Sequence, residues 1–182
     1  MPPVEVHIGD ICAVPSGYAD GCELTFTDPP WEQGMVKMAE TYLLRRAGIE
    51  PPGHTIDELL EHMFRLAPKD RPCYVEYSIK GQDRVTYWGR FHGHMPGQVW
   101  PIRQGNGRPC VLMTFNNPMP LPSYTPRIKE AIALVMGYHK PALVFEPFAG
   151  RGDYIAPMVK LGARVRGIEI NPALACQIKG TA

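Results

Sequence analysis

The chain has 182 residues, of which 45% are hydrophobic and 20% charged, and its formal net charge is +1 at pH 7. These values are ordinary for one globular domain with a substantial core, and no apolar run is long enough to span a membrane. Residues 1–5 lack the basic and apolar regions of a signal peptide, so we expect a cytoplasmic protein without a membrane partner. The five cysteines form no C-x-x-C pair, which favours the reduced thiols of that compartment.

Apolar periodicity, helix caps and proline or glycine breaks divide the chain into short elements. Strands are expected at residues 4–8, 23–28, 73–77, 110–115, 142–145 and 164–170. Helices are expected at residues 35–46, from 56 to the break at Pro68, at 127–137 and at 154–161. One helical turn and a loop are expected at 11–18, and short strands or loop pieces at 85–88 and 98–100. Strands that alternate with helices predict an α/β fold with a parallel, doubly wound sheet.

Two helix starts carry caps that can be read from the sequence. Thr55 and Glu58 form a capping box in front of the second helix. Thr125 and Pro126 are expected as the N-cap and the first residue of the helix that opens at Arg127.

The stretch that follows the second strand combines an acid, two prolines and an aromatic ring. Asp28 ends the strand, because Pro29 and Pro30 can continue neither a sheet ladder nor a helix at once. The Asp28 carboxylate and the Pro29 carbonyl could accept the two hydrogens of an amine, and Trp31 offers a surface on which a flat heterocycle could stack. The alternative is an ordinary Pro-Pro turn in which Asp28 caps the next helix.

A glycine-rich turn follows the buried strand at 142–145. Phe148, Gly150 and Gly152 lie between that strand and a helix, where the backbone can approach a ligand closely. Glu169 closes the next strand about twenty residues later, the usual place for an acid that binds a ribose. The alternative is a plain strand-turn-helix corner with a solvated Glu169.

Three acids, Asp10, Asp28 and Glu169, each end an expected strand. Since the carboxyl ends of parallel strands meet at one edge of the sheet, we expect the three side chains to surround one pocket.

Basic residues gather in the segment 78–109, whose only acid is Asp83. This segment is a candidate contact for a polyanion, and a solvated loop is the alternative. His92 and His94 have no further ligand at metal spacing, so no metal is expected. The candidate substrate-binding cations are Lys80, Arg84, Arg90 and Arg103.

Together, the motifs at residues 9–10, 26–31, 145–152 and 167–172 resemble the S-adenosylmethionine-dependent amino methyltransferases of DNA, in the β-class order. The resemblance implies a Rossmann-like methyltransferase fold with a mostly parallel sheet, one antiparallel strand and a circularly permuted motif order. It implies one domain over 1–182, with a catalytic half at 1–120 and a cofactor half at 121–182. In this family a separate target-recognition region is usual, and here only the short segment 78–109 could serve as one.

The resemblance also assigns site residues. The catalytic ones are Asp28, Pro29, Pro30 and Trp31. The residues that would bind S-adenosylmethionine are Asp10, Asp28, Thr125, Lys129, Glu146, Phe148, Ala149, Gly150, Arg151, Gly152, Glu169 and Asn171. Two of them depart from the family pattern, because the family usually has aspartate where Glu146 stands and serine where Arg151 stands.

By this resemblance the chain is expected to methylate N6 of adenine in DNA, and a homodimer is left open. Aspartate in front of the two prolines favours adenine over N4 of cytosine within the family. The Asp-Pro-Pro-Trp motif is also similar to that of messenger RNA adenosine methyltransferases, which leaves RNA as an alternative substrate. A protein amide, or a remnant that binds nucleic acid or cofactor without catalysis, are further alternatives. No covalent intermediate is expected, since the sulfonium methyl is already activated and catalysis is mostly positioning.

Overall fold

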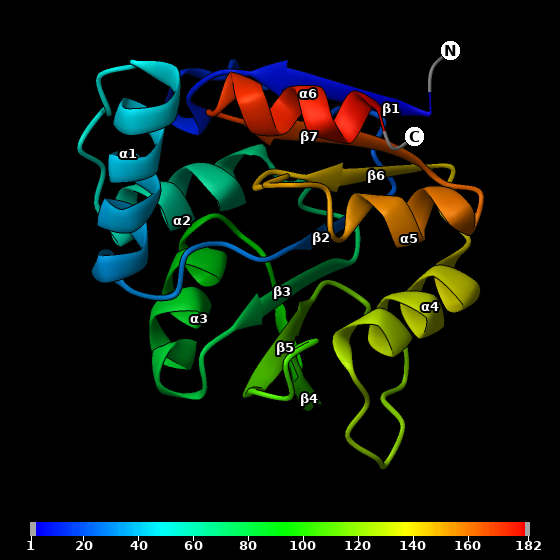
Figure 1. Cartoon of the computed structure of the whole chain (residues 1–182). Coiled ribbons are helices and arrows are strands. Elements are labelled where there is room, and N and C mark those ends of the chain that lie inside the picture. Colours follow the sequence, from blue (N-terminus) through cyan, green and yellow to red (C-terminus); the bar gives the residue numbers. More distant parts are fainter. Residues whose placement is uncertain (1–2, 181–182) are drawn as a thin grey trace.

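The structure, a computed structural model, describes residues 3–180, with side chains up to residue 178. A seven-stranded sheet runs through the molecule in the order β1-β7-β6-β2-β3-β5-β4, and helices lie on both of its faces (Figure 1). The strands are β1 (Val4–Ile8), β2 (Leu24–Thr27), β3 (Cys73–Tyr77), β4 (Pro96–Arg103), β5 (Pro109–Phe115), β6 (Leu143–Glu146) and β7 (Arg164–Glu169). The first five strands in spatial order are parallel, while β5 and β4 are antiparallel to their neighbours.

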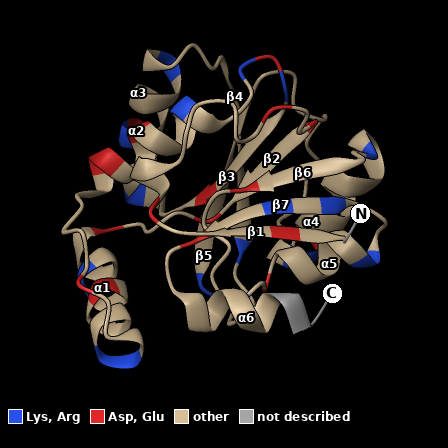
Figure 2. Ribbon diagram, turned by 90° about the horizontal axis from the view of Figure 1, so that it is seen from above, with Lys and Arg blue, Asp and Glu red and all other residues tan. Residues whose placement is uncertain are grey.

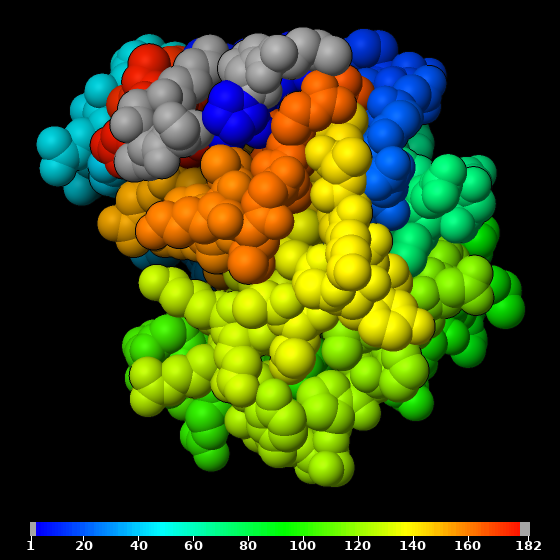
Figure 3. Space-filling model, turned by 90° about the vertical axis from the view of Figure 1, so that its right-hand side faces the viewer, coloured from blue at the N-terminus to red at the C-terminus, as the bar shows by residue number. Residues whose placement is uncertain are grey.

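In the described part of the chain, six α-helices and two 3-10 turns connect the strands. They are η1 (Ile11–Ala13), α1 (Gln33–Ala47), α2 (Ile56–Leu66), η2 (Ile79–Gly81), α3 (Gln82–Phe91), α4 (Ile128–His139), α5 (Ile155–Lys160) and α6 (Pro172–Gly180). Helices α4, α5 and α6 cover one face and α2 and α3 the other (Figures 1 and 2). Helix α1 lies beyond the carboxyl ends of the parallel strands, and at the far end α4 and α5 meet at the surface, yellow and orange in Figure 3.

The central strands are buried on both faces. All four residues of β2 and all five of β3 are buried, the polar Thr25, Thr27 and Glu76 included. Phe26 of β2 stacks on Tyr74 of β3 with ring centroids 6.0 Å apart. The core therefore extends directly behind the edge at which the parallel strands end.

Most of the expected elements are confirmed, including the capping box. The Thr55 hydroxyl accepts from the Glu58 N–H at 3.2 Å, and the Glu58 carboxylate accepts from the Thr55 N–H at 2.7 Å. Among the described residues, no helix combines the length and hydropathy needed to cross a membrane.

Residues 85–88 form part of helix α3, so the expectation of a strand or loop there was wrong. Val85 and Gly89 are its buried residues, one helical turn apart on the face toward the core. A Cβ on Gly89 would lie 2.5 Å from Cε1 of Phe115. The glycine that suggests a break in the sequence is thus what lets the helix pack closely on β5.

The predicted start of the third long helix was also wrong. Helix α4 begins at Ile128 with Arg127 as its N-cap, and Thr125 lies outside it. The Pro126 carbonyl accepts from the Arg103 N–H at 2.9 Å, and Arg103 and Arg127 form a parallel bridge. Pairing with β4 therefore keeps this stretch extended.

Candidate active site

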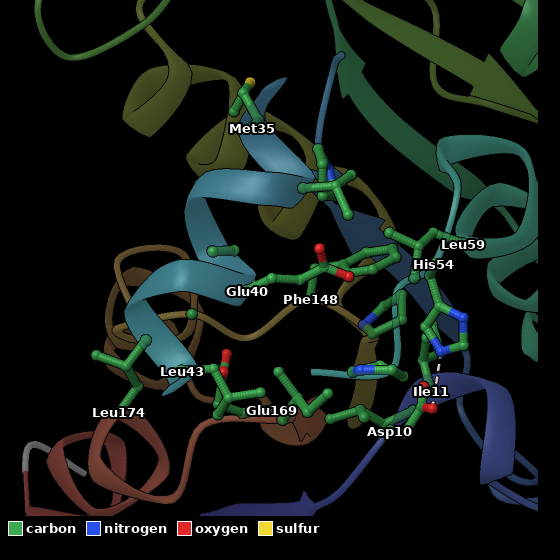
Figure 4. A pocket seen from close by; sticks show the side chains of 18 of the residues that line it. Asp10, Ile11, Met35, Glu40, Leu43, His54, Leu59, Phe148, Glu169 and Leu174 are labelled. Carbon is green, nitrogen blue, oxygen red and sulfur yellow. Dashed lines mark hydrogen bonds and ion pairs between the residues drawn. The ribbon is translucent and has the colours of Figure 1, made fainter. Parts of the chain in front are cut away.

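Three acids that follow parallel strands line one pocket, as the sequence predicts. Asp10 follows β1, Asp28 follows β2 and Glu169 ends β7, and all three border a cavity of about 310 Å³. Figure 2 shows acidic positions at the ends of several neighbouring strands, and Figure 4 shows Asp10 and Glu169 on the same side of the pocket. This volume is at the lower end of the range for small-molecule sites.

The glycine turn after β6 forms part of the same pocket. Phe148 and Gly150 line it, and Figure 4 shows the Phe148 side chain among those that surround the pocket. Gly150 has φ 52° and Gly152 has φ 84°, a region that favours glycine. The Ala149 N–H donates to the Ile168 carbonyl at 3.0 Å, which ties the turn to β7.

Glu169 and Asp10 are both held by the backbone that surrounds them. The Glu169 carboxylate accepts from the Asn171 N–H at 2.8 Å, and its burial raises its pKa. Asp10 accepts from the Cys12 N–H at 2.9 Å and lies 2.7 Å from Nε2 of His54. Each acid is therefore fixed at the rim before any ligand binds.

Helix α1 supplies the opposite wall. Met35, Val36 and Leu43 line the pocket together with Glu40, whose Oε1 is buried and has no hydrogen-bond partner among the described residues. Neither Glu40 nor His54 stands out in the sequence. An acid on a polar helix looks like any solvated charge until the helix is placed over the pocket, and His54 lies in a loop that is far from Asp10 in the sequence.

Asp28 is in contact with Trp31 through a hydrogen bond. The indole Nε1 donates to Oδ1 of Asp28 at 2.8 Å. Trp31 is only 6% exposed, and the Arg108 guanidinium lies 5.1 Å from its ring centroid. The expected open stacking surface is therefore absent in this form, in which the ring is buried in the core and covered by a cation.

Behind Asp28 lies a group of buried carboxyls that the sequence analysis did not identify. Glu76 of β3 is 0% exposed and accepts from the hydroxyl of Tyr154. Burial, then the nearby Glu76 charge, raises the pKa of Asp28 to about 8. The signal in the sequence was a lone glutamate within the otherwise uncharged strand 73–77.

Glu146 lies behind the glycine turn rather than on the pocket surface. It is 1% exposed, and its Oε1 accepts from the Thr27 hydroxyl at 2.7 Å and from the Phe148 N–H at 3.0 Å. Burial raises its pKa to about 8. This residue joins β2 to the turn, which is a different place from the one expected for a cofactor contact.

Several expected site residues lie away from this pocket. Thr125 borders a second hollow beside Cys110, and Lys129 and Arg151 border a third one with Lys160. Asn171 is buried and accepts from the Ala173 N–H at 3.0 Å with its side chain.

The four candidate substrate-binding cations are exposed. Arg84 lies 3.4 Å from Asp57, and Arg103 donates to the Gly107 carbonyl at 3.3 Å. Lys80 and Arg90 belong to η2 and α3, so the four are spread over the segment 78–109 rather than clustered at the pocket.

One group in the described part of the chain brings three potential metal ligands together. Asp10, Cys12 and His54 each offer a ligand atom within 4.8 Å of the others. Burial, then the neighbouring Asp10, raises the pKa of the Cys12 thiol to about 12.

No protein-family model and no curated protein matches the sequence. Solved structures do match the fold. A protein assigned as a DNA modification methylase from Thermus thermophilus, solved with S-adenosyl-L-methionine, aligns with a TM-score of 0.64 at 15% identity over 97% of this chain and 91% of that chain. M1.HpyAVI aligns with a TM-score of 0.67 at 12% identity over 98% of both chains. The PvuII DNA methyltransferase, which is cytosine-N4-specific, aligns with a TM-score of 0.55 at 12% identity over 98% of this chain and 88% of that chain.

These likenesses confirm the predicted fold class, a mostly parallel α/β sheet of the Rossmann-like methyltransferase type. At such identities they establish the fold alone. The chain therefore has, over nearly its whole length, the fold of these DNA methyltransferase structures.

Proposed function

We propose that this chain is an S-adenosylmethionine-dependent methyltransferase that acts on an exocyclic amine of a base in DNA, with N6 of adenine as its preferred target. The observation that supports this most is the shared pocket. Asp28 lines the same cavity as Phe148, Gly150 and Glu169, although more than a hundred residues separate it from them in the sequence.

The residues around the pocket fit a nucleoside cofactor. Asp10 and Glu169 are acceptors at one side, Phe148 is an aromatic surface, and the glycine turn leaves room for close approach of a ligand. Oε1 of Glu40 has no partner among the described residues, and a hydroxyl or amine of a ligand in the pocket would satisfy it. When bound, the sulfonium would supply a methyl group already activated for transfer.

The chain itself would bind and orient the amine. In this proposal the ionised Asp28 carboxylate and the Pro29 carbonyl accept the two amine hydrogens, which favours a geometry with the nitrogen lone pair free. Pro30 lines the pocket and Trp31 is fixed by its bond to Asp28. A base can stack on the Trp31 ring only after the Arg108 guanidinium moves away from it.

DNA is the proposed polymer partner, with Lys80, Arg90 and Arg103 as exposed candidates for phosphate contacts. Arg84 is a weaker candidate, because it is already 3.4 Å from the Asp57 carboxylate. A homodimer and a cytoplasmic location stay predictions from the sequence.

The test is transfer of a labelled methyl group from S-adenosylmethionine to duplex DNA, single-stranded DNA or RNA. Mass spectrometry of the product nucleosides separates N6-methyladenine from N4-methylcytosine. Asp28→Ala should abolish transfer while calorimetry still detects cofactor binding, and Asp70→Ala, at an exposed position, is the matched control. Full activity of Asp28→Ala would contradict the proposed role of Asp28, and absence of cofactor binding by the unmodified protein would contradict the proposed function.

A further inference from the structure

Helix α3 presents two aromatic rings to solvent. Tyr87 is 58% exposed and Phe91 is 63% exposed, whereas the other phenylalanines of the chain are buried or half-buried. The two rings are nearly parallel, with an interplanar angle of 23°, and their centroids are 6.2 Å apart, so neither covers much of the other. Together with Asp83, Thr86 and Arg90 they line an open hollow of about 490 Å³. Each ring therefore keeps much of its surface accessible to a ligand.

A third ring holds this pair in place. The half-buried indole of Trp88 is inclined by 79° to both rings, with its centroid 5.1 Å from that of Tyr87 and 5.5 Å from that of Phe91. Its Nε1 donates to Oδ1 of Asp57 at 2.9 Å, which ties the indole to the first turn of α2. Edge-to-face contacts of this kind are favourable. The two exposed rings are thus already oriented in the free protein, which lowers the entropy cost of binding a ligand.

Exposed cations lie at both ends of the aromatic pair. Lys80 precedes α3 in η2, and Arg90 lies in the last turn of α3. Lys69 lies beside Gly93, where an added Cβ would be 4.0 Å from its Cδ. In the part of the chain that the structure describes, none of these three cations forms an ion pair, and Asp83 is the one acid of α3. The charge of this face therefore suits a polyanion.

Helix α3 is connected to the pocket through α2, on which it packs. Asp57, which holds Trp88, follows shortly after His54 in the chain, and His54 lines the pocket and lies 2.7 Å from Asp10. In Figures 1 and 2, α3 lies on the same side of the molecule as α1 and α2. A polymer that crosses α3 can therefore continue toward the pocket.

We propose that the exposed face of α3 binds single-stranded DNA, whose bases stack on Tyr87 and Phe91. Lys69, Lys80 and Arg90 contact the phosphates on either side. The choice of DNA as the polymer rests on the function proposed above. Aromatic rings that stack on bases, combined with cations that follow the backbone, are the usual elements of a site for unpaired strands. A strand held here brings a target base to the pocket without the cost of unpairing a duplex.

A single strand fits this face better than a duplex or a second copy of the chain. Inside a duplex each base is stacked on both sides and offers only its edges in the grooves, whereas flat side chains need the face of a base. A symmetric contact between two copies would place the same cations on both sides of the interface, and such like-charge contacts are unfavourable. An unpaired strand offers base faces and negative charge together.

The test measures binding in the absence of S-adenosylmethionine, so it does not depend on activity. Fluorescence anisotropy gives the affinity of the protein for labelled oligothymidine of about 12 nucleotides. Two further probes of the same length are a duplex and a strand that carries abasic sugars in place of bases. Oligothymidine should bind more tightly than the abasic strand, because the two probes have the same phosphates and only oligothymidine can stack.

Substitutions on α3 then separate stacking from charge. Tyr87→Ala and Phe91→Ala should each weaken the binding of oligothymidine about tenfold and leave the binding of the abasic strand and the duplex unchanged. Tyr87→Phe keeps the ring and should bind as the unmodified protein does. Arg90→Ala should weaken the binding of both single strands and lower its salt dependence by about one counterion. The matched control is Tyr138→Ala, which removes a ring of the same 58% exposure from α4, on the other face of the sheet, and should change no affinity.

Three results would overturn the proposal. The first is an equal affinity of the unmodified protein for oligothymidine and the abasic strand. The second is tighter binding of oligouridine than of oligothymidine, which would assign the face to RNA. The third is a dimer in sedimentation analysis that Phe91→Ala converts to a monomer, which would assign the face to a second copy of the chain.

The same measurements separate failure of this proposal from failure of the proposed function. An affinity for oligothymidine that neither ring substitution changes overturns the site on α3 even in an active methyltransferase. Weakened strand binding in both ring variants of a protein that methylates none of the polymers would support the site on α3 and contradict the proposed function.

Discussion

Thr27 and Thr25 offer a sharp test of how the turn that carries Phe148 is anchored. Both side chains are buried on β2, but they differ in their partners. The Thr27 hydroxyl donates to the fully buried Glu146 at 2.7 Å, while the Thr25 hydroxyl has no partner among the described residues. Valine has nearly the shape of threonine without the hydroxyl, so each Thr→Val substitution tests the hydroxyl alone.

Thr27→Val should lower the free energy of unfolding by about 1 to 3 kcal/mol, because a buried acid loses one of its two donors. Thr25→Val should leave the free energy unchanged or raise it, since an unpaired buried hydroxyl is removed. Urea unfolding followed by circular dichroism measures both values, and an unchanged m-value indicates that both variants unfold as the unmodified protein does.

The effect of Thr27→Val should also depend on pH. Burial raises the pKa of Glu146 from 4.5 to about 8 in the folded protein, so its contribution to stability is full below pH 4.5 and is lost as pH rises through about 8. The Thr27 hydroxyl opposes this loss because it stabilises the ionised form. The destabilisation by Thr27→Val should therefore be larger at pH 9 than at pH 6. Equal effects of the two threonine variants, or a larger loss at pH 6, would refute this account of the anchor.

Three further substitutions test other parts of the structure. Gly89→Ala should destabilise the protein by about 1 to 3 kcal/mol, because its Cβ would lie 2.5 Å from the aromatic ring of Phe115 on β5. Gly137→Ala should stabilise α4 by about 0.5 to 1 kcal/mol, because the added Cβ would have no atom within 4 Å. Thermal unfolding of both variants measures these changes in stability. Glu40→Leu should raise the free energy of unfolding of the free protein and weaken cofactor binding about five- to tenfold in calorimetry, since it removes an unpaired acceptor from the pocket. Arg108→Ala should weaken DNA binding and lower the salt dependence of the binding constant by about one counterion. Arg71→Ala, at an exposed position near the start of β3, should leave DNA binding unchanged and is the control. Equal losses of DNA binding in the two variants would argue against a DNA contact at Arg108.

The parts of the fold and site that depend on local pattern could be predicted from the sequence. Asp10, Asp28 and Glu169 each lie at the end of a strand that the sequence predicts, and the carboxyl ends of parallel strands necessarily share an edge. Their convergence in one pocket therefore needed no knowledge of side-chain packing. Helix α3 could not be predicted in this way, since Gly89 looks like a break and its close approach to Phe115 depends on a strand much later in the chain.

Residues whose meaning depends on distant partners could not be identified. Glu40 becomes notable only when α1 is placed over the pocket, and Trp31 is covered by an arginine from a hairpin loop far along the sequence. Glu146 occupies a motif position where a cofactor contact was expected, but its hydrogen bond to Thr27 crosses 119 residues of sequence. In each case the residue type was visible, and the partner that determines its role was not.

The antiparallel strand β5 brings these observations together. It pairs with β3 so that Glu76 lies opposite Leu112, and it places the Cys110 thiol 3.4 Å from Oε1 of Glu76. The loop that joins β4 to β5 contributes Arg108, whose guanidinium lies 5.1 Å from the centroid of the Trp31 ring. A single hairpin therefore contacts both the buried Glu76 and the aromatic ring beside Asp28. If the chain binds DNA as proposed, a movement of this hairpin would change the surroundings of Glu76 and the access to Trp31 at the same time.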